Sequence, residues 1–105
     1  MGEKKYRVCL SAPLGRRTGT LVIKETGGRV EGRLEMMNRS NALFGTLSGD
    51  GRIVLSGSIK TLISTVQYTA EGTVSGRKIL LNLKTASGAY YPVFGEELNI
   101  DDEIL

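Results

Sequence analysis

The sequence predicts an all-β fold: a single antiparallel meander of about eight short strands that closes into a small β-barrel. Three observations lead to this fold class. Apolar and polar residues alternate over most of the chain, short turn sequences separate the alternating stretches, and a glycine recurs in the middle of several of them. The 105 residues are enough for one hydrophobic core and too few for two.

Alternation with a period of two is the clearest signal. In residues 29–37, four residues on one face are apolar or glycine, while Glu31, Arg33 and Glu35 fall on the other face. The same pattern runs through residues 52–61 and 65–74. Successive side chains of a strand point to opposite faces, so we expect each stretch to form a strand with one buried face. Weaker copies of the pattern begin at Tyr6, Gly19, Leu43, Ile79 and Tyr90.

Short turn sequences join these stretches. They include Gly27-Gly28, Gly49-Asp50-Gly51, Ser75-Gly76-Arg77 and Ser87-Gly88. Glycine, asparagine and aspartate readily supply the positive φ angles of tight hairpins. Connections this short can join only antiparallel neighbours, because a parallel crossover needs about a dozen residues or more. The expected connectivity is therefore a meander.

A five-residue motif of apolar, any, glycine, any and apolar residues recurs through the chain. It is complete around Gly32, Gly45, Gly57 and Gly72, and Gly19 belongs to a partial copy. In each full copy the glycine lies on the apolar face, which we expect to point inward. A glycine inside a strand costs entropy and adds no packing, so its repetition needs a reason. Three reasons stay open: bending of a coiled sheet, space for a ligand, and close approach of another backbone.

This arrangement resembles the calycin-type barrels, the lipocalins and especially the compact avidins. The resemblance rests on a meander of about eight short strands with turns every 12 or 13 residues. It spans most of the chain and is architectural. The chain has no Trp, so the tryptophans that line biotin in avidin-like proteins and the lipocalin Gly-x-Trp opening are both absent. The resemblance implies the barrel fold and leaves any ligand open.

The residues that most catalytic and metal chemistry needs are missing. The chain has no His, and Cys9 is its single cysteine, which excludes the usual zinc sites and the commonest general base. We find no phosphate-binding loop, dinucleotide fingerprint or Gly-x-Ser-x-Gly elbow. Asp50 lies in a Gly-Asp-Gly turn, where we expect a local role. We therefore expect no enzyme, no cofactor and no metal site.

Four residues are candidates to line a ligand site if the barrel is hollow. They fall on faces expected to point inward, and they are Tyr6, Met36, Tyr68 and Tyr91. The alternative is that they belong to a packed core. A buried tyrosine usually needs a partner for its hydroxyl.

Four apolar residues fall instead on faces expected to be polar: Val22, Phe44, Val54 and Leu80. A cluster of such residues on the surface marks an interface. They are the candidate contact residues of a self-associating module, which would form a homodimer.

The charge of the chain is uneven. Residues 1–95 hold 14 basic and six acidic side chains, whereas the last ten residues hold five acidic side chains and no basic one. We divide the chain into a β-barrel domain, residues 1–95, and an acidic C-terminal tail or short helix, residues 96–105. A basic body can keep a small domain soluble or attract anionic partners. Nucleic acid is the least favoured partner, because the only aromatic residues expected to face outward, Phe44 and Tyr90, are far apart in the sequence.

No apolar run approaches the roughly 20 residues of a membrane-spanning helix, and the first residues do not form a secretory signal. We expect a cytoplasmic protein with no membrane partner. The favoured function is a non-enzymatic binding module that holds a small apolar or amphipathic ligand in the barrel. The alternatives are a self-associating protein-interaction module and a basic surface that binds nucleic acid. A cavity with an open mouth favours the first reading, and an interior filled by side chains opposes it.

Overall fold

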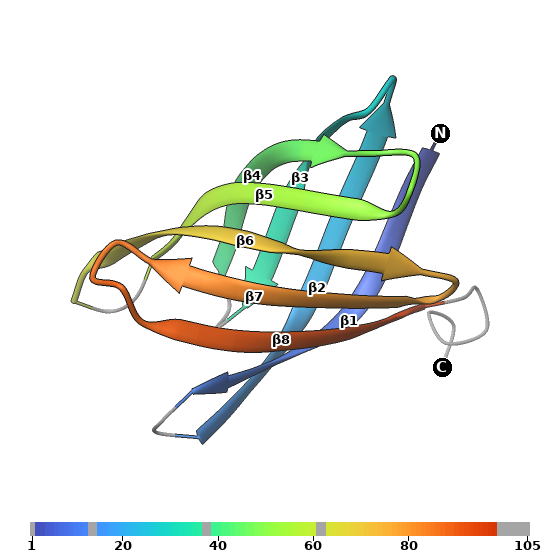
Figure 1. Cartoon of the computed structure of the whole chain (residues 1–105). Helices are drawn as coiled ribbons and strands as arrows, with labels where there is room; N and C mark the ends of the chain where they lie inside the picture. The colour runs from blue at the N-terminus through green and yellow to red at the C-terminus, as the bar shows by residue number, and fades with distance from the viewer. Residues whose placement is uncertain (1, 13–14, 37–38, 61–62, 99–105) are drawn as a thin grey trace.

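The computed structural model describes residues 2–12, 15–36, 39–60 and 63–98. These residues form eight strands and no helix: β1 (Gly2–Ala12), β2 (Gly15–Thr26), β3 (Arg29–Met36), β4 (Arg39–Leu47), β5 (Arg52–Lys60), β6 (Thr65–Ser75), β7 (Lys78–Thr85) and β8 (Tyr90–Glu97). Each strand is antiparallel to the next, and β8 pairs with β1, so the meander closes into a barrel (Figure 1). The predicted fold class is confirmed. Among the described residues, no helix is long and apolar enough to cross a membrane.

Glycines form several of the hairpin turns, as the sequence predicts. The β2–β3 turn has φ angles of 58° at Gly27 and 85° at Gly28, a region that side-chain-bearing residues avoid. The backbone N–H of Gly28 donates a hydrogen bond of 2.8 Å to the carboxylate of Glu25, which closes this turn.

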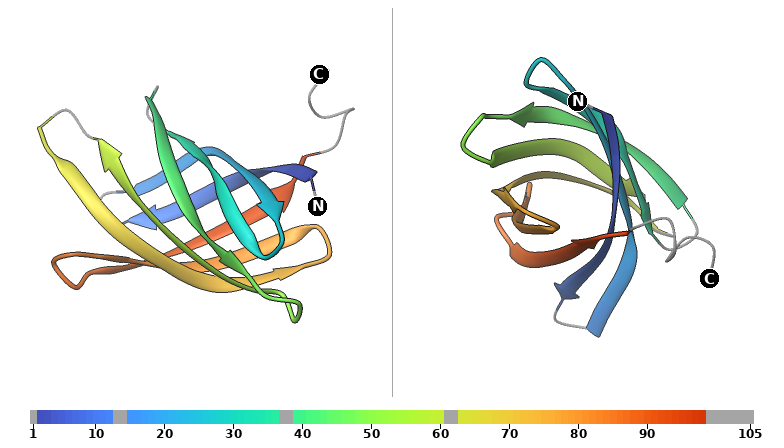
Figure 2. Two further views of the ribbon diagram at one scale, coloured as in Figure 1. Left: turned by 90° about the horizontal axis from the view of Figure 1, so that it is seen from above. Right: turned by 90° about the vertical axis from the view of Figure 1, so that its right-hand side faces the viewer.

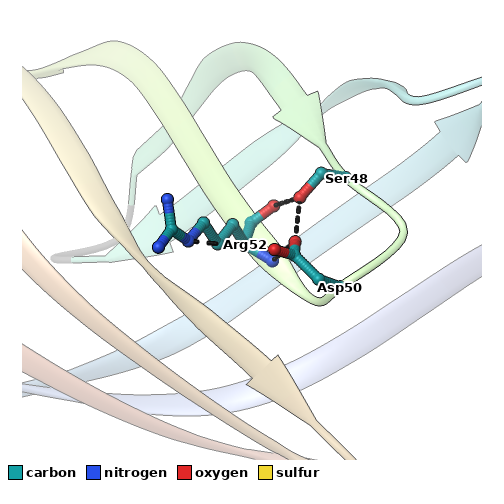
Figure 3. A network of polar contacts seen from close by, with 3 residues as sticks. All are labelled: Ser48, Asp50 and Arg52. Carbon is teal, nitrogen blue, oxygen red and sulfur yellow. Dashed lines mark hydrogen bonds and ion pairs between the residues drawn. The ribbon is translucent and has the colours of Figure 1, made fainter.

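The β4–β5 turn is held by Asp50 (Figure 3). Its carboxylate accepts a hydrogen bond from the hydroxyl of Ser48 and another, of 3.2 Å, from the backbone N–H of Arg52. The first of these bonds lowers the pKa of the Asp50 carboxyl most, and the second lowers it further. The local turn role predicted for Asp50 is confirmed.

The inward side chains form one apolar cluster that runs around the barrel. It includes Tyr6 and Val8 of β1, Leu55 of β5, Ile79 of β7 and Val93 of β8. Outward neighbours on the same strands are mostly exposed; β7, for example, alternates exposed and buried residues along its whole length. The period-two pattern therefore identified the inner face correctly.

The inward glycines lie where neighbouring strands approach too closely for a side chain. A Cβ atom placed on Gly32, Gly45 or Gly72 would lie 1.9, 1.8 or 1.7 Å from a backbone carbonyl oxygen of the adjacent strand. No real Cβ atom is tolerated at such a distance, so only glycine permits this curvature. At these three positions the missing side chain leaves no empty space, because the neighbouring backbone fills it. This observation favours the bending and closure explanation.

The β1–β2 hairpin extends beyond the rest of the barrel (Figures 1 and 2). β1 pairs with β2 along its full length, but its pairing with β8 stops at Leu10. β2 pairs with β3 only from Gly19 onward. The far end of this hairpin is therefore a two-stranded ribbon. At the opposite end, β8 includes Glu96 and Glu97, and residues 99–105 of the expected tail lie outside the described residues.

Candidate functional site

The ladder between β4 and β5 ends early. The two strands are paired from Leu47↔Ile53 only as far as Leu43↔Gly57. Beyond that point residues 39–42 of β4 and residues 58–60 of β5 continue as strand but do not pair with each other. We call this parted end of the two strands the β4–β5 seam.

A buried amide bridges the seam. Asn41 of β4 is only 4% exposed. Its Nδ2 donates a hydrogen bond of 3.3 Å to the carbonyl of Leu34 on β3, and its Oδ1 accepts one of 3.1 Å from the backbone N–H of Lys60 on β5. An amide can donate and accept at once, so this one side chain replaces part of the missing ladder. The sequence interpretation did not select Asn41, although a polar residue at an inward position was a usable signal.

Tyr68 lies beside the seam on the inner face. It pairs in register with Gly57, and its hydroxyl oxygen lies 2.9 Å from the place where a Cβ atom of Gly57 would be. The residue is 6% exposed, and its hydroxyl has no hydrogen-bond partner in the structure. Burial raises the pKa of Tyr68 to about 12. A buried hydroxyl without a partner is destabilising, so its retention here calls for an explanation.

Tyr68 is also one of the residues that line a surface hollow with a volume of about 790 Å³. Gly57, Tyr68 and Thr85 belong to its lining, together with residues on the outer faces of β4 to β7: Phe44, Ser56, Ser58, Gln67, Thr69 and Lys84. Hydroxyl and amide groups therefore surround one exposed aromatic ring and one ammonium group. Such a lining suits a ligand with both a polar and an apolar part.

The other predicted lining residues lie on the inner face but not at this hollow. Tyr6 and Met36 are buried, and Tyr91 packs against the core while partly exposed. The hydroxyl of Tyr6 also lacks a partner, and the pKa of Tyr6 is raised first by burial and then by the charge of Glu97. None of these three residues lines the hollow at Tyr68. The structure thus separates Tyr68 from the rest of the predicted set.

The prediction that Val22 joins an exposed apolar cluster is wrong, because Val22 is only 2% exposed. It points outward from β2 between Lys5 and Arg33, its register partners on β1 and β3. The long aliphatic stems of such residues cover apolar surface between them. Alternation fixed the direction of Val22 correctly but did not reveal that it is buried.

The other three candidate interface residues are exposed but do not form one cluster. Phe44 and Val54 lie on β4 and β5, whereas Leu80 lies on β7 with β6 between. Leu80 pairs in register with Phe94 of β8, which is 54% exposed and was not selected from the sequence. Its outward position follows from the inward positions of Val93 and Gly95, so alternation could have found it.

A second hollow, of about 700 Å³, lies beside Leu80 and Phe94. Cys9 of β1 pairs in register with Phe94 on the other side, which makes a row of three less polar residues across β1, β8 and β7. Arg7, Glu96 and Lys78 form the next row. We call these six residues the β8 face. Among the described residues, no three or more His, Cys, Asp or Glu side chains gather in a way that could hold a metal ion.

Comparison with known proteins gives a fold and no family. No protein-family model and no curated protein matches the chain. A redesigned beta barrel, mFAP1, whose structure was solved bound to DFHBI, is 13% identical over 90% of this chain and 92% of that chain, with a TM-score of 0.60. The redesigned beta barrel b11L5F_LGL is 12% identical over 90% of each chain, with a TM-score of 0.62. At such low identity the likeness shows the barrel fold alone.

Proposed function

We propose that this protein is a non-enzymatic binding module, and that a small amphipathic ligand binds at the β4–β5 seam. The observation that carries the proposal is the buried hydroxyl of Tyr68, which has no partner, in a residue that also lines the hollow. A ligand with a polar group at this point would supply the missing hydrogen bond. Desolvated polar groups left unpaired in the free protein favour ligands that pair them.

The surroundings of Tyr68 define the class of ligand. The outward hydroxyls of Ser56, Ser58 and Thr69 offer hydrogen bonds, and Phe44 offers an apolar surface that is 65% exposed. Lys84 supplies a positive charge, and its Nζ lies 5.6 Å from the ring centre of Tyr90. We infer an anionic or hydroxylated head group joined to an apolar or aromatic part.

The seam suits a ligand better than the centre of the barrel does. Inward side chains from all eight strands already pack there in one cluster, and a ligand would have to displace them. The calycin-like resemblance supports binding by a barrel of this shape, as does the structure of mFAP1 bound to DFHBI. Neither identifies a ligand for this chain.

Fluorescence titration with 8-anilinonaphthalene-1-sulfonate, an amphipathic anion, tests the proposal. Ser56→Trp places an indole in the hollow and should weaken binding at least tenfold. Thr20→Trp, a matched change on the outer face of β2, should leave binding unchanged. Tyr68→Phe removes one hydrogen bond and should weaken binding about fivefold. Absence of binding, or an equal loss for both Trp variants, would overturn the proposal.

A further inference from the structure

The β8 face carries two apolar and two oppositely charged residues in neighbouring rows across β7 and β8. Leu80 and Phe94 are 48% and 54% exposed and are register partners. Lys78 and Glu96, also exposed, are register partners in the next row. Among the described residues, neither of these two takes part in an ion pair. We propose that this face binds a second copy of the chain, in a two-fold symmetric dimer whose axis runs between β7 and β8.

The register of the two strands makes the face complementary to itself. β7 and β8 lie side by side (Figure 1). A half-turn about an axis parallel to both strands, midway between them, places β7 of one copy over β8 of the other. Residues of the same row then face each other, because this rotation does not shift positions along the strands. Phe94 of each copy meets Leu80 of the other, and Glu96 meets Lys78, as in the isologous contact of a two-fold dimer.

The charges of the face favour a second copy over a partner of a single sign. The charged residues that line the hollow here are two of each sign: Arg7, Lys78, Glu96 and Glu97. A basic partner would bring like charge toward the two cations, and an acidic partner would do the same to the two carboxylates. Like charges brought together at an interface oppose binding. The half-turn instead pairs Lys78 with Glu96 twice.

The apolar row favours this axis over its nearest alternative. Two copies of Leu80 and Phe94 bring four exposed apolar side chains together and remove them from water, which is favourable in proportion to their area. The hollow of about 700 Å³ beside them leaves room for the facing side chains. An axis between β8 and β1 would pair Glu96 with Arg7, but it would place Phe94 on Cys9, which is smaller and already half-buried. The axis between β7 and β8 therefore buries more apolar surface.

Sedimentation velocity of the full chain tests the proposal, at concentrations up to about 1 mM because small interfaces are weak. The mass should rise from one chain to two with concentration. It should stop there, because a two-fold contact closes on itself. A chain that stays monomeric at every concentration, or a mass that keeps growing beyond two chains, would overturn the proposal.

A matched pair of substitutions tests the apolar row. Leu80→Gln should weaken the dimer at least tenfold, because the residue occurs twice in the contact. Val54→Gln, at a residue of β5 that is 39% exposed, should leave the dimer unchanged. An equal loss for the two variants would count against this face.

Charge reversal tests the position of the axis. Lys78→Glu and Glu96→Lys should each weaken self-association several-fold, because each sets like charges opposite each other. The two variants mixed in equal amounts should associate as the original chain does, because a mixed dimer regains both ion pairs. A mixture that stays monomeric would contradict the pairing. Association that is lost in Arg7→Glu but kept in Lys78→Glu would place the axis between β8 and β1 and overturn the proposed dimer.

Two checks separate these outcomes from other effects. Circular dichroism melts establish that each variant remains folded. None of the substituted residues lines the hollow at the β4–β5 seam, and the two hollows share no residue. Self-association and ligand binding at the seam can therefore fail independently of each other.

Discussion

The β1–β2 pair and the β4–β5 pair each consist of two strands of nearly equal length, but the two pairs differ in how completely their strands are hydrogen-bonded to each other. β1 and β2 pair from Gly2↔Glu25 to Ala12↔Gly15 without interruption. β4 and β5 stop pairing at Leu43↔Gly57, and a side-chain amide from Asn41 continues the connection. In an uninterrupted ladder the backbone N–H and C=O groups of the two strands form hydrogen bonds with each other, without help from side chains. A parted ladder depends on particular side chains and leaves room for a hollow.

This difference indicates that the close strand contacts that curve the barrel and the room for a hollow lie in separate places. Where strands pair fully, the glycines allow close backbone contact and leave no vacancy. Where the strands part, a Cβ atom on Gly57 would lie 2.9 Å from both the Ala42 carbonyl oxygen and the Tyr68 hydroxyl, so the contact is looser and partly with a side chain.

The largest expected effect comes from a methyl group on a glycine of a complete ladder. In Gly72→Ala the Cβ would meet the backbone of β7 at 1.7 Å, and we expect a loss of about 3 kcal/mol or more in the free energy of unfolding. Gly57→Ala meets its nearest atoms at 2.9 Å, one of them the movable hydroxyl of Tyr68, and should cost about 1 kcal/mol. Urea unfolding measures both, and equal losses would contradict the comparison.

Alkaline pH should destabilise the protein through Tyr68. Its pKa is about 12 in the folded state because of burial, against about 10 when unfolded. The stability contributed by its neutral form is complete below pH 10 and is lost as the pH rises towards 12. The loss is at most about 3 kcal/mol. Tyr68→Phe should reduce this decline in urea unfolding measured at pH 8 to 11.5; an unchanged decline would show that the hydroxyl is not desolvated.

Removing the amide bridge should have the next largest effect. Asn41→Ala deletes the hydrogen bonds to Leu34 and Lys60 and should lower the free energy of unfolding by about 2 kcal/mol. In this variant the amide hydrogen of Lys60 should exchange faster than in the original protein, whereas exchange in β1 should change less. Asn82→Ala, at an exposed position of β7, is the matched control and should change stability by less than about 0.5 kcal/mol. Similar losses for the two variants would mean that the seam does not need its bridge.

The smallest effect should come from the turn that joins β4 and β5 at the opposite end of the seam. The hydroxyl of Ser48 and then the N–H of Arg52 lower the pKa of the Asp50 carboxyl. Its stabilising contribution is present above its ordinary pKa of about 4 and is lost as the pH falls below that value. Asp50→Asn should therefore lower the melting temperature slightly at pH 7 and hardly at pH 2.5. Glu71→Gln, on β6, is the control, and an equal shift at both pH values would contradict the assignment.

The fold was predictable because strand direction is encoded locally. Alternation placed Tyr68 and Gly57 on the inner face, and glycine turns fixed antiparallel neighbours. The site was not predictable to the same degree, since it depends on register between strands. Nothing local in the sequence indicates that the ladder stops at Gly57, that Phe94 lies beside Leu80, or that neighbouring side chains bury Val22.

The pairing of the first strand with the last has a consequence for the order of the chain. Tyr6 is the register partner of Glu97, so the described ends, Gly2 and Leu98, lie at the same rim of the barrel. A short linker between them, with the chain opened instead at Gly76-Arg77, would give every strand the neighbours that it has now. Because every strand has a hydrogen-bonded neighbour on both sides, no strand needs to be first or last in the chain. A circular permutant should therefore fold to the same architecture.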